Sequence, residues 1–311
     1  MTRRNEGRGS VMRKVFVVAG AALWFAAGSA VAAQDPALGL GAPVNMGPVV
    51  NSGAVDTEPT FSSDGSTMYF SCHDRRDPAG ADICVSYRDD EGAWTAPEIV
   101  GPPISSPEWR EQEPLLSPDG TELYIMSDRP GGMGSVDIWV SEWEDGGWGE
   151  LRNLGAPINS EFADHCLYFA GPDWEIAYWT STRPGGYGGN DIWMSERIDG
   201  EWQEPVNLGP LVNSEASDHH SLPSADGNSL YITSNREGGY GLEDIYVTTR
   251  NAAGEWGPLV NLGPLVNTET NDRCPAFSPD YTRFYWDTER AGGSGAKDLW
   301  WIATESLPGA S

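Results

Sequence analysis

Short runs of alternating apolar and polar residues follow one another along most of the chain, and turns rich in Gly, Pro and Asp separate them. One segment illustrates the pattern. Its predicted strands cover Glu111–Leu116, Leu123–Met126, Ile138–Ser141 and Trp148–Leu154. Short runs bounded by such turns are typical of antiparallel β-strands. Beyond the N-terminal region no stretch has the periodicity of an amphipathic helix, so the pattern predicts an all-β fold.

The same four-strand pattern recurs five times. Its marker is the aspartate directly before the third predicted strand of each unit. This residue is found at Asp82, Asp137, Asp191, Asp244 and Asp298, at intervals of 55, 54, 53 and 54 residues. A period in this range, built from short strands, is typical of tandem repeats, and four antiparallel strands per repeat form the blade of a β-propeller.

The two ends of the repeat region complement each other. The fifth unit ends without the fourth-strand sequence that the third unit carries at Pro205–Asn213, whereas an equivalent sequence is present at Pro43–Asn51. The N-terminal segment is therefore expected to supply the outer strand of the last blade, which removes exposed strand edges. We predict a single five-bladed β-propeller over residues 43–304, closed by an N-terminal strand that completes the last blade.

Three motifs of the second unit carry a resemblance to a known family. Leu116–Gly120 has the sequence LSPDG, Ser127–Gly132 has SDRPGG and Asp137–Trp139 has DIW. These motifs resemble the TolB-type, WD-repeat-like β-propeller repeat family, and the resemblance covers all five units. It implies an exported bacterial protein, often periplasmic, that binds another protein or an envelope component. No Gly-x-Ser-x-Gly motif of a fused hydrolase is present.

The first 33 residues have the character of a secretory signal peptide. Five Lys/Arg residues precede the apolar stretch Val15–Ala27, and small residues at 30–33 offer a cleavage site. Residues 34–42 would form a linker and residues 305–311 a C-terminal tail. These features predict a periplasmic or secreted protein that does not insert into the membrane once the signal is removed.

The chain is strongly acidic. Its formal net charge is −27, and removal of the basic leader leaves 14 basic and 45 acidic side chains. Such a charge disfavours nucleic acid and anionic membranes as partners and favours cations. We expect a monomer with a protein or a cell-envelope glycan as its partner, and no nucleic acid.

An arginine recurs eight residues before the marker aspartate in four of the five units. The four pairs are Arg129 and Asp137, Arg183 and Asp191, Arg236 and Asp244, and Arg290 and Asp298. Because both residues flank the same Gly-rich turn, we predict an ion pair that clamps this turn. The repetition favours a structural role over a catalytic one.

Two cysteines depart from the repeat within the first unit. Cys72 stands where the other units have Ser or Thr, and Cys84 stands where they have Trp or Tyr. Both fall on strands that one turn joins. In an exported protein this arrangement predicts a Cys72–Cys84 disulfide.

The first predicted strand of each unit carries most of the candidate chemistry, including three of the four histidines. The first position, which we call the acid tier, holds Asp56, Glu111, Asp164, Asp218 and Asp272. The third position holds Glu58, Glu113, Cys166, His220 and Cys274. Side chains two residues apart share a face of a strand. Both sets are therefore expected to face the central channel that the inner strands surround.

Several interpretations of these positions stay open. The repeated acids are expected to accept hydrogen bonds from neighbouring turns. The third position predicts a metal site through Cys166, His220 and Cys274, with Glu58 and Glu113 beyond them. Such ligands suit zinc or copper, and the acidic surroundings add calcium as a candidate. No Cys-x-x-Cys spacing supports the site, and a Cys166–Cys274 disulfide across the channel is the alternative.

Glycoside hydrolysis is the enzymatic alternative, because it needs two carboxyl groups at a suitable separation. The candidate acids and bases are Asp56, Glu58, Glu113, Asp164 and Asp218. Trp109 and Phe162, which come just before two inner strands, would then stack on a sugar ring. The acids recur from blade to blade, however, whereas a catalytic pair should be singular.

We therefore favour an exported, non-catalytic binding propeller. Its ligand surface is predicted at the channel mouth formed by the loops that precede the inner strands, with Trp109, Phe162, His165 and His219 as candidate contacts. These loops cover residues 52–56, 105–111, 160–164, 214–218 and 268–272. A glycan-active enzyme is the second interpretation and a metal-binding propeller is the third.

Overall fold

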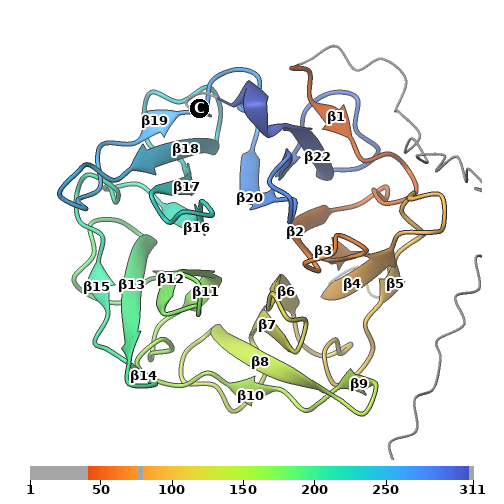
Figure 1. Ribbon diagram of the computed structural model, residues 1–311, viewed down its shortest axis with the longest axis horizontal. Coiled ribbons are helices and arrows are strands. Elements are labelled where there is room, and N and C mark those ends of the chain that lie inside the picture. The colour runs from red at the N-terminus through yellow and green to blue at the C-terminus, as the bar shows by residue number, and fades with distance from the viewer. Residues whose placement is uncertain (1–40, 76–79, 308–311) are drawn as a thin grey trace, which may run out of the picture. The chain divides into compact units, whose positions relative to one another are not determined.

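The computed structural model describes residues 41–75 and 80–307. Over these residues five small antiparallel sheets surround a central axis, as Figure 1 shows. The all-β, five-bladed propeller predicted from the repeats is thereby confirmed. The predicted signal peptide and most of the predicted linker lie outside the described residues.

Each blade runs from an inner strand at the axis to an outer strand at the rim (Figure 1). Blade 1 contains β2 (Asp56–Phe61), β3 (Thr67–His73), β4 (Ala81–Tyr87) and β5 (Glu98–Ile99). Blade 2 contains β6 (Glu111–Leu116), β7 (Glu122–Ser127), β8 (Asp137–Glu144), β9 (Gly147–Trp148) and β10 (Arg152–Asn153). Blade 3 contains β11 (Asp164–Ala170), β12 (Ile176–Ser181), β13 (Asp191–Ile198), β14 (Glu201–Trp202) and β15 (Val206–Asn207).

The last two blades follow the same plan. Blade 4 contains β16 (Asp218–Pro223), β17 (Ser229–Ser234), β18 (Asp244–Thr249) and β19 (Val260–Asn261). Blade 5 contains β20 (Asp272–Phe277), β21 (Arg283–Thr288), β22 (Asp298–Ala303) and β1 (Val44–Asn45). The outer strands are only two residues long, which is shorter than the predicted run from Trp148 to Leu154, because the chain leaves the sheet after two ladder pairs.

The N-terminal strand β1 completes the last blade. It pairs antiparallel with β22, with Val44 opposite Trp301 and Asn45 opposite Trp300. Asn51 strengthens this closure, because its side chain accepts a hydrogen bond from the backbone N–H of Leu299 and donates one to the Leu299 carbonyl. Asn159, Asn213 and Asn267 bind the third strands of blades 2, 3 and 4 in the same way.

The C-terminal end of the propeller extends beyond the predicted boundary at residue 304. A 3-10 helix, η1 (Thr304–Ser306), follows β22. Leu307 is buried after this helix and packs in an apolar cluster with Phe284 and Trp286. Within the described residues no helix is long and apolar enough to cross a membrane.

Apolar side chains hold neighbouring blades together. The second strand of every blade is buried along nearly its whole length. Ile83 of blade 1 and Ile125 of blade 2, for example, lie in one cluster and are almost completely buried. Each such side chain contributes roughly 1.5–3 kcal/mol when it is removed from water. The blades therefore form a stiff ring around the axis.

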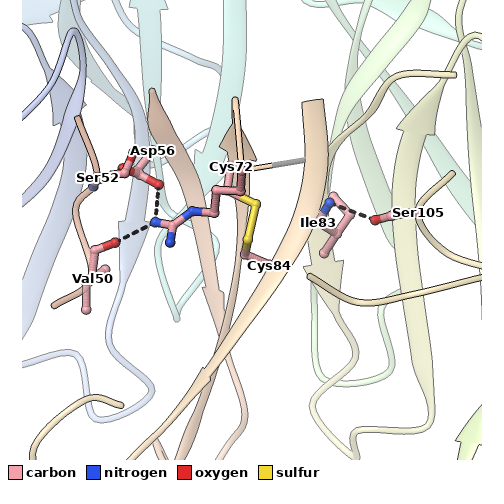
Figure 2. Close-up of a disulfide and its surroundings, with 8 residues drawn as sticks. Val50, Ser52, Asp56, Cys72, Ile83, Cys84 and Ser105 are labelled. Carbon is pink, nitrogen blue, oxygen red and sulfur yellow. Dashed lines mark hydrogen bonds and ion pairs between the residues drawn. A yellow bond between two sulfur atoms is a disulfide. The ribbon is translucent and has the colours of Figure 1, made fainter. Parts of the chain in front are cut away.

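A disulfide joins Cys72 on β3 to Cys84 on β4, with an S–S distance of 2.01 Å (Figure 2). Both sulfur atoms are buried inside blade 1. Cys166 and Cys274 are free thiols, so the structure does not contain the alternative disulfide between them.

Candidate functional site

A β-bulge interrupts every inner strand at its third residue. This residue has a left-handed backbone in all five blades, with φ values of 60° at Glu58, 56° at Glu113, 51° at Cys166, 51° at His220 and 52° at Cys274. The pairing with the second strand shifts register at the same point in each blade. A bulge of this kind re-aims the side chain of the extra residue. The expectation that the first and third positions face the same environment is therefore wrong.

The acid tier is buried and bound within its own blade. The side chains of its five residues have no exposed surface, and each pairs with an arginine. The ion pairs are Arg75–Asp56 at 2.7 Å, Arg129–Glu111 at 2.9 Å, Arg183–Asp164 at 2.7 Å, Arg236–Asp218 at 2.5 Å and Arg290–Asp272 at 3.2 Å. The acid tier thus has the structural role that its repetition indicates.

The same arginines hold the connections between blades. The Arg183 guanidinium also donates to the carbonyl of Ile158, and the backbone N–H of Ser160 donates to Asp164 from the other side. Figure 2 shows the equivalent arrangement in blade 1, where Asp56 and the Val50 carbonyl share one guanidinium group. Both oxygens of these carboxylates are occupied, which leaves the acid tier without a free acid or base.

The predicted pairs between each arginine and the marker aspartate are wrong. Arg129 pairs with Glu111, and Asp137 instead accepts hydrogen bonds from the backbone N–H groups of Met133 and Gly134. The marker aspartate itself closes the Gly-rich turn, so no arginine is needed there. The sequence pattern also missed Arg75, because it lies seven rather than eight residues before Asp82.

The bulge residues converge on the propeller axis and form a closed ring across the blades. We call Glu58, Glu113, Cys166, His220 and Cys274 the axial ring. The Glu113 N–H donates to Glu58 Oε2 over 2.9 Å, and the Cys166 N–H donates to the Glu113 carboxylate. Cys166 Sγ lies 3.2 Å from Glu113 Oε1 and 3.6 Å from His220 Nε2. Cys274 Sγ lies 3.2 Å from the same His220 atom and 3.9 Å from Glu58 Oε1.

The two glutamates of the ring differ in charge. Burial, together with the nearby Glu113 carboxylate, raises the pKa of Glu58 to about 7. Burial would also raise the pKa of Glu113, but the attraction and hydrogen bond of His165 outweigh it and lower that pKa to about 2. At neutral pH Glu113 is therefore ionised, and it pairs with His165 over 3.2 Å. Glu58 exchanges its proton in the neutral range.

Burial also governs the other three ring residues. It raises the pKa of the Cys166 and Cys274 thiols well above their usual range, and nearby carboxylates act in the same direction. Burial, together with the neighbouring His219, lowers the pKa of His220 well below its usual value. In the metal-free protein these three groups are neutral, because burial and the nearby carboxylates outweigh the attraction that Arg273 exerts on the Cys274 thiolate.

A polar shell lies beside the ring, formed by the second residues of the inner strands and their neighbours. His165 Nδ1 lies 3.0 Å from Cys166 Sγ, and His219 Nε2 lies 2.9 Å from Glu243. Arg273 contacts Glu243 over 3.3 Å and also pairs with Asp287. The predicted contacts His165 and His219 are thus bound to neighbouring protein groups.

A cavity of about 340 Å³, which we call the axial chamber, lies against the ring where the inner strands end. The five ring residues contribute to its lining, and the remaining lining is largely apolar. Its aromatic side chains are Phe61, Tyr168, Phe169, Trp174, Phe277 and Tyr281. Phe169 and Trp174 stack with their ring centroids 4.5 Å apart. The sequence pattern did not indicate this chamber, because its aromatic residues look like ordinary strand and turn residues.

The chamber does not involve the loops that precede the inner strands. Trp109 and Phe162 are not among its lining residues. Trp109 is 37% exposed, and its backbone N–H donates to Ser106. The structure therefore brings the predicted metal ligands together, but it leaves Trp109 and Phe162 away from them.

Comparison with known proteins supports the fold alone. No protein-family model matches the chain, and no curated protein matches it by sequence. A protein from Agrobacterium tumefaciens described as TolB is similar in structure, with a TM-score of 0.51, 15% identity and coverage of 86% of this chain and 87% of that one. An α-L-arabinofuranosidase from Podospora anserina, solved with cellotriose, has a TM-score of 0.52, 16% identity and coverage of 83% and 94%. A thermostable family-43 glycoside hydrolase has a TM-score of 0.53, 12% identity and coverage of 81% and 91%. A protein described as TolB and two glycosidases thus share this architecture.

Proposed function

We propose that this chain is an exported, non-catalytic binding propeller whose ligand occupies the axial chamber. The observation that carries the proposal is a chamber with an apolar, aromatic wall on one side of a five-residue polar ring. Ligand sites are typically apolar concavities of roughly 300–1,000 Å³ with a few convergent polar groups. The buried disulfide and the predicted signal peptide support an oxidising, extracytoplasmic location.

The chemistry of the chamber favours a protein partner that inserts an apolar segment. Aromatic and aliphatic groups provide most of the wall, and they would bury an apolar side chain or short peptide tip. The strongly acidic chain would favour basic residues on both sides of this tip. Such a partner would bind more weakly at high salt, because exposed charges are screened.

A peptide-binding measurement tests this proposal. Peptides covering exported proteins of the source cell, each with an apolar tip and basic flanks, are screened against the purified protein, and affinities are measured by calorimetry. Phe169→Ala should weaken binding at least about tenfold, because it removes part of the chamber wall. Trp109→Ala is the matched control, since it removes an aromatic residue outside the chamber. Loss of binding in Trp109→Ala alone would move the ligand surface to the loops that precede the inner strands.

Glycan hydrolysis is the second candidate function, and the structure reduces the number of candidate catalytic acids. Asp56, Asp164 and Asp218 are buried in ion pairs, so only Glu58 and Glu113 of the candidate acids remain next to the chamber. Their environments push the two pKa values apart, to about 7 and about 2, as an acid and a base require. Turnover of an arabinoside or xyloside panel, lost in Glu58→Gln, would establish this activity and replace the binding proposal.

A further inference from the structure

We propose that the axial ring binds one thiophilic metal ion, Zn(II) or Cu(I), through Cys166, His220 and Cys274, with Glu58 as the fourth ligand. This inference adds a metal ion to the proposed binding site. It rests on the proposed function only in that the ion would lie at the inner end of the axial chamber. Two thiolates and one imidazole are a donor set that both ions accept.

Two of the three donor distances, those from His220 to each thiol, match the separation of ligands on one ion. Two ligands at zinc, one sulfur at about 2.3 Å and one nitrogen at about 2.0–2.1 Å, lie about 3.6 Å apart when the geometry is tetrahedral. His220 Nε2 lies 3.6 Å from Cys166 Sγ and 3.2 Å from Cys274 Sγ. The two thiols belong to separate groups of ligand atoms within 4.8 Å, one with His219 and His220 and the other with Glu58 and His220. A side-chain rotation at Cys166 would therefore have to bring its sulfur onto the ion that Glu58, His220 and Cys274 share.

The ion would lie off the centre of the ring. The ligand atoms of Glu58, His220 and Cys274 lie within 4.8 Å of one another, whereas the five ring residues do not form one such group. Glu113 is held by His165 and by the Cys166 N–H, whereas Glu58 offers a carboxylate oxygen within 4.8 Å of both His220 and Cys274. The geometry thus selects the side of the ring that contains His220, the two cysteines and Glu58.

The state of the cysteines supports a metal rather than a second disulfide. The chain contains a disulfide at Cys72–Cys84, yet Cys166 and Cys274 are free and both face the same His220 atom. A neutral imidazole nitrogen cannot serve two thiols equally, because it forms one hydrogen bond along its lone pair or its N–H. A metal ion satisfies all three groups at once and protects the thiolates from oxidation.

A buried acid beside the ring provides an independent observation. Asp287 is completely buried, and within the described part of the chain neither of its carboxylate oxygens accepts a hydrogen bond. Arg273 Nε lies 3.5 Å from one of its carboxylate oxygens. Its negative charge acts on the Cys274 thiol, which places it next to a proposed ligand. Asp287 and Glu58 thus place two carboxyl groups beside Cys274, opposite the single guanidinium of Arg273, and this local excess of acids favours a cation in the ring.

Metal titration of the full folded chain tests the site. Protein prepared without an affinity tag is stripped with a chelator and reloaded with ZnCl₂, or with Cu(I) under reducing conditions, and the bound metal is counted by elemental analysis. We expect one ion per chain. Cys166→Ser, Cys274→Ser and His220→Gln should each lower the affinity at least about 100-fold in competition with a chromophoric chelator. His73→Gln is the matched control, because His73 contacts Gln112 outside the ring, and it should bind like the parent protein.

Two further measurements use the parent protein, so their result does not depend on whether the variants fold. Co(II) in the parent protein should give the intense visible bands of a tetrahedral site and a thiolate-to-metal charge-transfer band. Metal should also slow alkylation of Cys166 and Cys274, as read by mass spectrometry. Weak octahedral Co(II) bands, unchanged alkylation, or parent-like affinity in the Cys166→Ser/Cys274→Ser double variant would overturn the site. Peptide binding measured in chelator separates this outcome from failure of the chamber proposal.

Discussion

The acid tier and the axial ring lie two residues apart on the same inner strands, yet they follow opposite rules. The acid tier repeats one chemistry five times, and every member binds an arginine of its own blade. The axial ring repeats one backbone conformation five times, but it presents three kinds of side chain. Positions that repeat the same side-chain chemistry in every blade therefore belong to the structural framework. Positions that repeat the backbone conformation but vary the side chain belong to the candidate site.

The direction of the contacts explains this difference. An acid-tier carboxylate is bound by groups that the same repeat and its connecting loop supply, so any unit can reproduce it. Ring contacts cross between blades, as from Cys166 to His220 or from Cys274 to Glu58. The side chain at a ring position can consequently differ from unit to unit. Its hydrogen-bond partners within the ring come from the neighbouring blades.

The largest expected effect comes from breaking the acid tier. Arg183→Ala leaves the buried Asp164 carboxylate without its cation and should lower the free energy of unfolding by about 3–5 kcal/mol. Urea denaturation followed by tryptophan fluorescence measures this change. The control is Arg152→Ala, which removes an exposed pair with Glu142 and should change stability by less than about 0.5 kcal/mol. Equal effects in the two variants would contradict the structural role of the acid tier.

The two cysteine pairs give the next largest contrast. Cys72→Ser/Cys84→Ser removes a covalent link across 12 residues and should cost about 2–4 kcal/mol. Cys166→Ser/Cys274→Ser keeps similar volumes and should cost clearly less when both proteins are measured in chelator. Differential scanning calorimetry of the two double variants checks the order. A larger loss from the ring pair would mean that these thiols stabilise the fold without metal.

A smaller effect should separate residues that tolerate the bulge from residues that do not. Asn tolerates left-handed backbone, whereas a β-branched residue is strained there. His220 has a φ of 51°, so His220→Val should be about 1–2 kcal/mol less stable than His220→Asn. Parallel denaturation curves give the difference. Equal stability would show that the bulge relaxes when its side chain changes.

The smallest effect is expected outside both sets. Trp109 is partly exposed, so Trp109→Ala should change the free energy of unfolding by no more than about 0.5 kcal/mol. Metal affinity should stay the same. Thermal unfolding together with the metal competition assay checks both expectations, and a loss of metal binding would indicate that the loops before the inner strands help to form the ring.

The repeats predicted the fold because every unit carries the same strand and turn signals. The closure by β1 was also predictable, because the missing fourth strand of the last unit reappears near residue 43. The arginine partners were not predictable from spacing. Sequence distance along a hairpin placed Arg129 near Asp137, but the guanidinium reaches across the inner strand to Glu111.

The candidate site was predictable in its residues but not in its geometry. The scarce Cys and His residues indicated the ring, whereas strict strand alternation would have placed the acid tier beside it. A signal of the bulge was present in the sequence, since Pro59, Pro114 and Pro275 directly follow three of the ring residues. Proline inside an inner strand is found mainly at bulges. The chamber wall carries no such signal, because its side chains meet only after the ring has closed.

The repeated bulge makes the centre of this propeller a socket with five interchangeable positions. The ladder hydrogen bonds set where each Cβ atom lies, and the choice of side chain sets only what the socket recognises. Thiol, carboxylate, imidazole or amide side chains could therefore be exchanged at the ring position of one blade at a time, while the number of positions stays five. The distances between ring positions would be set by the propeller backbone. A new ligand specificity would then require different side chains in the ring rather than a new fold.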